Sequence, residues 1–208
     1  MIILKFSKIA SLAKRNKSAI LMHDEDGQQW LSVGSAAYCL ENMPLLDEDT
    51  VLTVMGISDD NRNKWYTRYQ AEPSEILRND LPGEVEITAE DAGITVIWGG
   101  SLLTPIYTMD GVIWIDTELM APTVKKDDPY KRYFIRKLGK NRVVAVKDGM
   151  VLSAVILEYR KGGSSLFEAL DTLADRCRAE ERKMGHVEKL TEAEVLYKIG
   201  GLYEEEGR

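Results

Sequence analysis

The sequence predicts an α+β fold in which antiparallel sheets are followed by C-terminal helices. Short apolar runs with a period of two alternate with turn sequences such as Asp-Gly along most of the chain, which is typical of antiparallel strands. The order strand, helix, strand, strand, strand occurs twice, which indicates a duplicated β-α-β-β-β unit. After Tyr159 the apolar period changes to 3.6 residues, the spacing of amphipathic helices.

The first copy of this unit is predicted within the N-terminal 41 residues. Ser7 is a candidate N-cap for a short helix, because the apolar residues Ile9, Leu12 and Ala13 follow at helical spacing. The turn sequence at 24–27 and the Gly-Ser break at 34–35 then separate predicted strands at 19–22, 30–33 and 36–40.

The second copy begins with a strand at 112–115, and Asp116 or Thr117 caps a short helical turn after it. Pro122 is expected to end that turn, because proline cannot continue a helix. Turn sequences then separate predicted strands at 133–137, 142–146 and 151–158.

The segment between the copies begins with an acidic and then apolar stretch at 47–57. Ser58 is predicted to cap a helical turn that carries Trp65, Tyr66 and Tyr69. Further strands are predicted at 85–88, 94–98 and 102–107. Proline, glycine and charge make 71–83 linker-like, so the predicted division is a first α/β half (1–70), a linker (71–83), a second half (84–163) and a helical appendage (164–208).

Charge is distributed unevenly along the chain. The net charge is −7, yet residues 1–17 hold five basic residues and no acid, and residues 125–147 hold nine basic residues and two acids. Most such runs solvate a surface, but two basic runs on one face would attract a polyanion. The segregation therefore keeps DNA among the expected partners.

The chain carries few signals of catalysis. It has two histidines and two cysteines in unrelated segments, and it lacks the P-loop and Gly-x-Ser-x-Gly motifs. We therefore predict no catalytic residue, no metal and no cofactor, and interpret His23 beside Asp24 and Asp26 as a solvated hairpin tip. Carboxylate pairs that meet only in three dimensions keep an uncharacterised enzyme as a third alternative.

Aromatic and arginine residues crowd one polar segment. Because such residues are enriched at binding hot spots, the segment is a candidate surface for a protein or for bases. The candidate residues are Trp65, Tyr66, Arg68 and Tyr69.

No apolar run approaches the roughly 18 to 20 residues that span a bilayer, and the first residues lack a basic leader. We therefore expect no membrane association and a cytoplasmic location.

A doubled strand-helix-strand-strand-strand unit with cations at each helix resembles the subunit plan of sliding DNA clamps. The resemblance implies helices that face DNA phosphates and assembly into a homo-oligomer. The long acidic insert, Pro122 and the C-terminal helices depart from that plan. The residues that the resemblance would place on DNA are Lys8, Lys14, Arg15, Lys17, Lys125, Lys126, Lys131 and Arg132.

The sequences Gln28-Gln29-Trp30-Leu31 and Asp148-Gly149-Met150 are also similar to uncharacterised proteins of prophages in Gram-positive bacteria. That resemblance implies a phage or mobile-element context. The resulting hypothesis is a non-enzymatic, clamp-like accessory protein of DNA metabolism that works with DNA or a replication protein. The alternative is a module that recruits or blocks a host protein.

Overall fold

The computed structural model describes residues 5–23, 27–70, 73–82, 85–109, 111–124 and 129–160, together with 168–170, 172–173, 175–176 and 179. The chain forms two compact units, residues 1–161 and 162–208. In the second unit the described residues are helical, and the rest of the predicted appendage lies outside the described residues.

The helices of the first unit are short. Within its described residues they are α1 (Phe6–Asn16), α2 (Glu48–Val54), α3 (Asp59–Arg62), α4 (Thr117–Met120) and the 3-10 turns η1 (Glu75–Leu77) and η2 (Ala121–Thr123).

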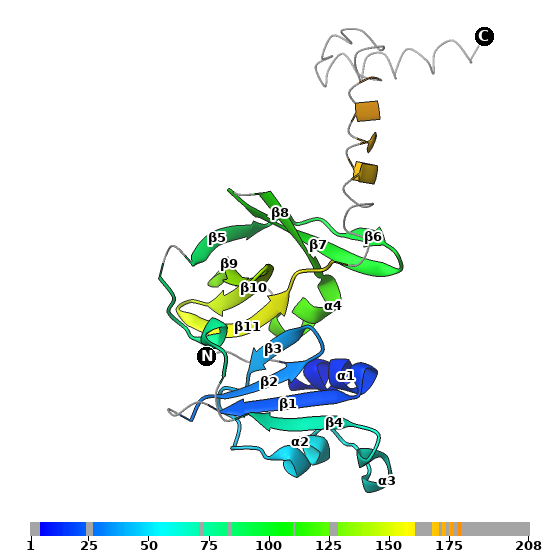
Figure 1. Cartoon of the computed structure of the whole chain (residues 1–208), viewed down its shortest axis with the longest axis vertical. Helices are drawn as coiled ribbons and strands as arrows, with labels where there is room; N and C mark the ends of the chain where they lie inside the picture. The colour runs from blue at the N-terminus through cyan, green and yellow to red at the C-terminus, as the bar shows by residue number, and fades with distance from the viewer. Residues whose placement is uncertain are drawn as a thin grey trace, which may run out of the picture. The chain divides into compact units, whose positions relative to one another are not determined.

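The strands form one mixed sheet (Figure 1). Its order is β4-β1-β2-β3-β11-β10-β9-β5-β7-β6, with β8 paired to β7, and among the described strand pairs only β1 and β4 run parallel. The α+β class with a mainly antiparallel sheet is therefore confirmed. The strand bounds are β1 Ser18–His23, β2 Gln29–Val33, β3 Ala36–Cys39, β4 Tyr66–Gln70, β5 Glu86–Asp91, β6 Val96–Trp98, β7 Ser101–Thr108, β8 Gly111–Asp116, β9 Lys131–Leu138, β10 Asn141–Asp148 and β11 Val151–Leu157.

Two antiparallel meanders, β1–β2–β3 and β9–β10–β11, meet at the centre of the sheet. β3 pairs with β11 from Ala36 opposite Ile156 to Tyr38 opposite Ala154. The segments that we predicted as separate halves thus share one continuous sheet.

Alternate strand residues build a core on each face of the sheet, as the period of two predicts. We call the face on which α1, α2 and α4 pack the helix face. Its core includes Ile9, Leu12, Ala13, Leu21, Leu31, Val51, Leu52, Leu119, Val144 and Ile156. The core of the opposite face includes Met22, Trp30, Cys39, Ile76, Leu77, Val143, Ala145 and Leu152.

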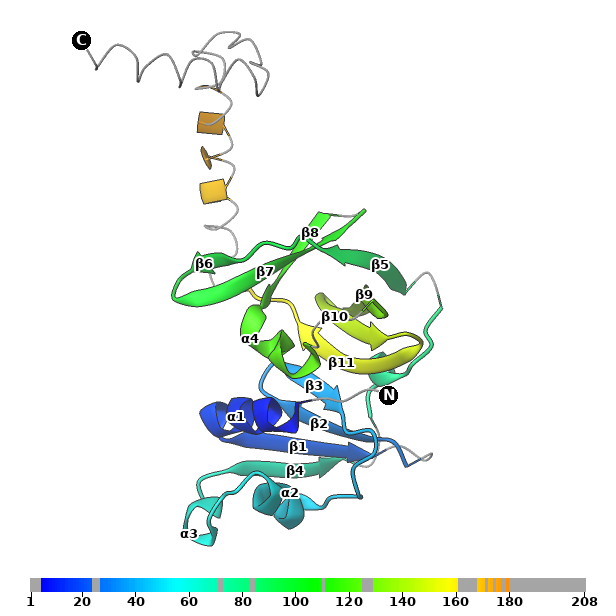
Figure 2. The ribbon, with the colours of Figure 1, turned by 180° about the vertical axis from the view of Figure 1, so that it is seen from behind.

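β5 changes its pairing partner along its length. Its residues from Glu86 to Ala89 pair with β9, whereas Glu90 and Asp91 pair with β7. β7 and β8 therefore fold over the second meander, as both views show (Figures 1 and 2). The backbone N–H of Tyr159 donates to the carbonyl of Trp114 at 2.7 Å, which joins the end of β11 to β8.

Residues 73–82, within the segment predicted as a linker, are anchored to the sheet. η1 buries Ile76 and Leu77 against the face opposite the helices. The fully buried guanidinium of Arg136, on β9, donates to the carbonyls of Ile76 (2.5 Å), Arg78 (2.6 Å) and Asn79 (3.1 Å). Because a buried cation holds these backbone carbonyls, the segment is fixed to the sheet. We call residues 73–82 the strap.

One carboxylate neutralises this strap anchor. Glu86 accepts from Nε of Arg136 at 2.8 Å through Oε1 and from Nζ of Lys147 at 2.7 Å through Oε2. All three side chains are at most 10% exposed. A charge taken out of water is costly unless it is paired and hydrogen-bonded, so Glu86 stabilises two buried cations at once.

We predict that Glu86→Gln lowers the free energy of unfolding by about 3 to 5 kcal/mol, because it leaves two buried cations without a carboxylate. Urea unfolding followed by circular dichroism measures the change. Glu75→Gln is the matched control: its carboxylate is 83% exposed and 3.8 Å from Arg78, so the loss should stay below about 1 kcal/mol. Equal losses in the two variants would contradict the role of Glu86.

Ser7 is not the N-cap of the first helix, so that prediction is wrong. α1 begins at Phe6 after Lys5, whose N–H donates to the carbonyl of Pro122 at 3.0 Å. This contact with η2 fixes a helix start two residues earlier than the local sequence indicates, and Ser7 lies inside the first turn.

The prediction of a helical turn that carries Trp65, Tyr66 and Tyr69 is also wrong. α3 ends at Arg62, and Tyr66–Gln70 form β4. The N–H of Tyr66 donates to the carbonyl of Lys17 at 2.9 Å, and the strand continues parallel to β1. Pairing with a distant strand therefore outweighs the local helix signal.

Candidate functional site: a basic hollow beside α1

A cavity lined by three lysines lies where the C-terminal end of α1 meets the α2–α3 segment. We call it the basic hollow. Its volume is about 320 Å³, near the lower end for small-ligand sites. Its described lining consists of Lys14, Lys17, Gly56, Ile57, Ser58, Asn61, Lys64 and Trp65, a set with three lysines and no carboxylate.

The turn after α2 forms one wall of the hollow. Gly56 has a φ of +71°, which favours glycine, and its N–H donates to the carbonyl of Thr53 at 2.9 Å. The N–H of Ile57 donates to the carbonyl of Leu52 at 3.0 Å. These two bonds are those of a Schellman motif, which ends a helix and turns the chain sharply. The sequence of α2 thus directs residues 57–65 back toward α1.

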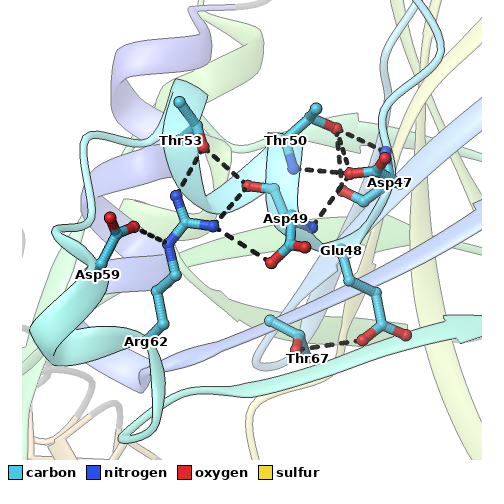
Figure 3. Close-up of polar contacts among 8 residues, drawn as sticks. All are labelled: Asp47, Glu48, Asp49, Thr50, Thr53, Asp59, Arg62 and Thr67. Carbon is cyan, nitrogen blue, oxygen red and sulfur yellow. Dashed lines mark hydrogen bonds and ion pairs between the residues drawn. The ribbon is translucent and has the colours of Figure 1, made fainter.

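α2 itself begins with a strong cap. The carboxylate of Asp47 accepts from the N–H of Thr50 at 2.7 Å and of Asp49 at 3.1 Å, and the Thr50 hydroxyl accepts from the N–H of Asp47 at 2.7 Å (Figure 3). The hydrogen bond from the Thr50 N–H is the main reason that the pKa of Asp47 lies below its ordinary value.

Arg62 holds α3 against α2 (Figure 3). Its Nη2 donates to the Thr53 hydroxyl at 2.8 Å, its Nη1 lies 3.2 Å from Oδ1 of Asp49, and its Nε lies 2.9 Å from Oδ1 of Asp59. These contacts occupy the one arginine of α3 with nearby acids. Its charge is used for structure, whereas the lysines beside it face the hollow.

A chain of linked polar side chains lines the α3 side of the hollow. Nζ of Lys64 donates to Oδ1 of Asn61 at 2.9 Å, and Nδ2 of Asn61 donates to Oγ of Ser58 at 2.9 Å. A serine oxygen that accepts one bond keeps its own O–H for another acceptor, and an ammonium has three donors. The hollow therefore presents donors and positive charge, a combination that suits an anion.

Lys17 joins the two sides of the hollow through its backbone. It ends α1 with a φ of +51°, a left-handed conformation that costs a non-glycine residue roughly 1 kcal/mol. Its carbonyl accepts from the N–H of Tyr66, which places Trp65 beside α1. The strained position carries a lysine where glycine or asparagine would be better tolerated.

We predict that Lys17→Gly leaves the stability unchanged or raises it by up to about 1 kcal/mol, because glycine adopts this φ without strain. The same change should weaken anion binding, because it removes one cation from the hollow. Thermal unfolding measures the first effect, and Lys14→Gly, inside α1, is the control that should lose about 1 kcal/mol. A destabilised Lys17→Gly variant would contradict this view of the position.

The structure divides the cations predicted on α1 between two sides of the helix. Lys14 and Lys17 line the hollow, whereas Arg15 lies on the side toward α4. Lys8, seven residues before Arg15, shares the helix face of Arg15 by its spacing. Arg15 forms an ion pair with Glu118 of α4. Its charge is thus partly neutralised, while Lys14 and Lys17 lie among lining residues without a carboxylate.

Asp116 caps α4 beside this ion pair. Its carboxylate accepts from the N–H of Glu118 at 2.9 Å, as the predicted cap requires. Burial raises the pKa of Asp116, and the nearby Arg15 opposes this rise. The adjacent hydroxyl of Tyr38 donates to the carbonyl of Leu119 at 2.6 Å, and burial raises the pKa of that phenol.

A raised carboxyl pKa means that the native state binds its proton more tightly than the unfolded chain does. That contribution to stability is present in acid and is lost as the pH rises through the native pKa. We predict that Asp116→Asn, which keeps the cap acceptor, does not show this loss. The free energy of unfolding of the variant minus that of the wild type should therefore increase from about pH 4 to 7. Urea unfolding at several pH values measures it, and a constant difference would contradict the prediction.

The second predicted basic segment is only partly described. Lys125 and Lys126 lie outside the described residues. Lys131 shares the register of Tyr133 and Ile135 on the helix face, with its Nζ 5.2 Å from the centre of the Tyr133 ring, and Arg132 projects to the opposite face. The structure therefore does not bring Lys131 and Arg132 together.

The four predicted protein-binding residues are also divided. Trp65 lines the hollow. By its register with β1, Tyr69 lies on the helix face, where its ring centre is 5.2 Å from that of His23. Tyr66 and Arg68 project to the opposite face and are exposed.

Sequence reasoning missed five lining residues of the hollow: Gly56, Ile57 and the polar residues Ser58, Asn61 and Lys64. The signal available for them was local, because Ser58 precedes a short helix and Lys64 precedes the aromatic segment. Nothing in that signal indicated that the segment returns to Lys17.

Other sites receive less support. Nε2 of His23 lies 2.7 Å from Oε1 of Gln29, while Asp24 and Asp26 lie outside the described residues. Among the described residues, no group of three or more histidine, cysteine, aspartate or glutamate side chains is arranged to hold a metal ion. No helix in the described part of the chain combines the length and apolar character needed to span a bilayer.

Family models, curated proteins and solved structures were each compared with the chain, and none matches it.

Proposed function

We propose that the protein is a non-enzymatic accessory factor of DNA metabolism that binds the DNA backbone through the basic hollow. One observation carries the proposal: Lys14, Lys17 and Lys64 converge on a single cavity whose described lining contains no carboxylate. On a chain with a net charge of −7, such a concentration of cations favours a polyanionic partner at this place and disfavours it elsewhere.

Phosphate contacts provide most of the affinity of such a site. Each lysine that neutralises a phosphate releases counterions, so binding weakens as salt is added, with a slope of about −0.7 to −0.9 per contact. Three lysines would give a total slope of roughly −2 to −3. The site would therefore bind weakly at physiological salt and act together with a further surface or partner.

A clamp-like arrangement is the finer form of this proposal. It is supported by the recurrence of a helix followed by a three-stranded meander, with α1 and α4 on the same face and β3 paired to β11. The folded-over β7 and β8 depart from it. A clamp would further require a homo-oligomeric ring, and a monomer in light scattering would contradict that form while leaving DNA binding by the hollow intact.

We predict that changing Lys14, Lys17 and Lys64 together to glutamate abolishes DNA binding at low salt. Fluorescence anisotropy with labelled DNA measures the affinity and its salt slope, and each single lysine-to-glutamine change should reduce the slope by about 1.

A charge control changes Lys137 and Lys140, exposed on the β9–β10 hairpin, to glutamate, and it is compared with the double change of Lys14 and Lys64 to glutamate. It alters the net charge in the same direction and should retain most of the binding. Equal losses of affinity in the control and hollow variants would show that the effect depends on net charge alone. Undetectable binding by the wild type would reject the proposed function.

The second candidate function is the binding of a host or phage protein at β4. It is favoured by the position of β4 at the end of the sheet and by Tyr66, which is 57% exposed there. Part of this edge is already used, because the N–H of Tyr69 donates to Glu48 at 2.8 Å. The hollow therefore remains the better supported site.

A further inference from the structure

We propose that the basic hollow accepts one unpaired nucleotide, so that the protein prefers single-stranded to double-stranded DNA. This inference rests on the proposed function and specifies its ligand. It follows from the presence of an indole, that of Trp65, among the lining lysines.

The lining combines two kinds of group that a simple anion site does not need. Lys14, Lys17 and Lys64 provide charge, whereas Trp65 and Ile57 provide apolar surface. A phosphate alone would use only the first kind. A nucleotide uses both, because its phosphate is anionic and its base has an aromatic face that stacks on aromatic side chains.

Packing against the core orders the indole of Trp65. Trp65 is partly buried, and both Trp65 and Ile57 pack against the core of the helix face. The backbone N–H of Trp65 donates to the carbonyl of Arg62 at 3.0 Å. The backbone N–H of the neighbouring Tyr66 donates to the carbonyl of Lys17. An aromatic ring that is ordered before binding loses little entropy when a base stacks on it.

The size of the hollow argues against a duplex. A volume of about 320 Å³ admits one small ligand or one residue of a chain. In a double helix the bases are stacked on one another, so their faces are not available to Trp65 unless a base is flipped out at a cost of a few kcal/mol. An unpaired strand presents its bases without that cost.

The experiment compares the full chain on three fluorescein-labelled ligands of equal length: a thymine oligonucleotide, the same strand with abasic sites, and a duplex. Anisotropy at low salt gives each affinity. We expect the thymine strand to bind on the order of tenfold more tightly than the abasic strand, because stacking is lost while the phosphates remain. Wild-type protein that binds both strands equally would overturn the inference.

A variant provides the second test. Trp65→Leu should bind the thymine and abasic strands equally and retain the salt slope, because the three lysines are unchanged. The matched control is Trp98→Leu, a partly buried tryptophan on β6 that lies outside the lining, which should keep the thymine preference. Should Trp65→Leu fail to fold, the comparison of ligands on the wild type still decides.

The outcomes separate the two proposals. If every DNA binds equally and the lysine variant abolishes binding, the proposed function stands and the unpaired-nucleotide inference is wrong. If no DNA binds, both are wrong. If the duplex binds more tightly than the thymine strand, the inference is overturned and the clamp-like form gains support.

Discussion

The packing of α1 on the sheet decides how most of the first unit is arranged. Ile9, Leu12 and Ala13 are buried on β1 and β2, and removing such apolar surface from water is the main favourable contribution to folding. The burial fixes the rotation of the helix about its axis. That rotation directs Lys14 and Lys17 toward the α2–α3 segment and Arg15 toward Glu118 of α4. α1 therefore connects the basic hollow with α4.

Cations are used in two different ways in this molecule. Arg136 is fully buried, and its guanidinium donors are taken up by Glu86 and by three carbonyls of the strap. Nothing remains with which it could bind a ligand. The lysines of the hollow are exposed, and the part of the lining that the structure describes holds donors and no carboxylate. A satisfied cation stabilises the fold, whereas a cation without a nearby carboxylate attracts an anion from solution.

Much of the local structure could be predicted from the sequence. The hairpins at 19–33 and 133–158 and the cap at Asp116 depend on hydrogen bonds and periodicity within a few residues, and the structure contains them. The predictions at Ser7 and at residues 65–69 are wrong because a distant segment competes there. Pro122 accepts from Lys5, and β1 pairs with β4.

By itself, the sequence determined a short amphipathic helix with lysines at its end, an acidic and then apolar stretch at 47–57 and an aromatic segment after Lys64. Only the tertiary structure decided that these three features meet. The reason is physical: local propensity acts over one or two turns, whereas the parallel pairing of β1 with β4 gains its free energy from contacts between segments far apart in the chain. The charge pattern indicated a polyanion, and the meeting of Lys14, Lys17, Lys64 and Trp65 in one hollow determines where such a ligand would bind.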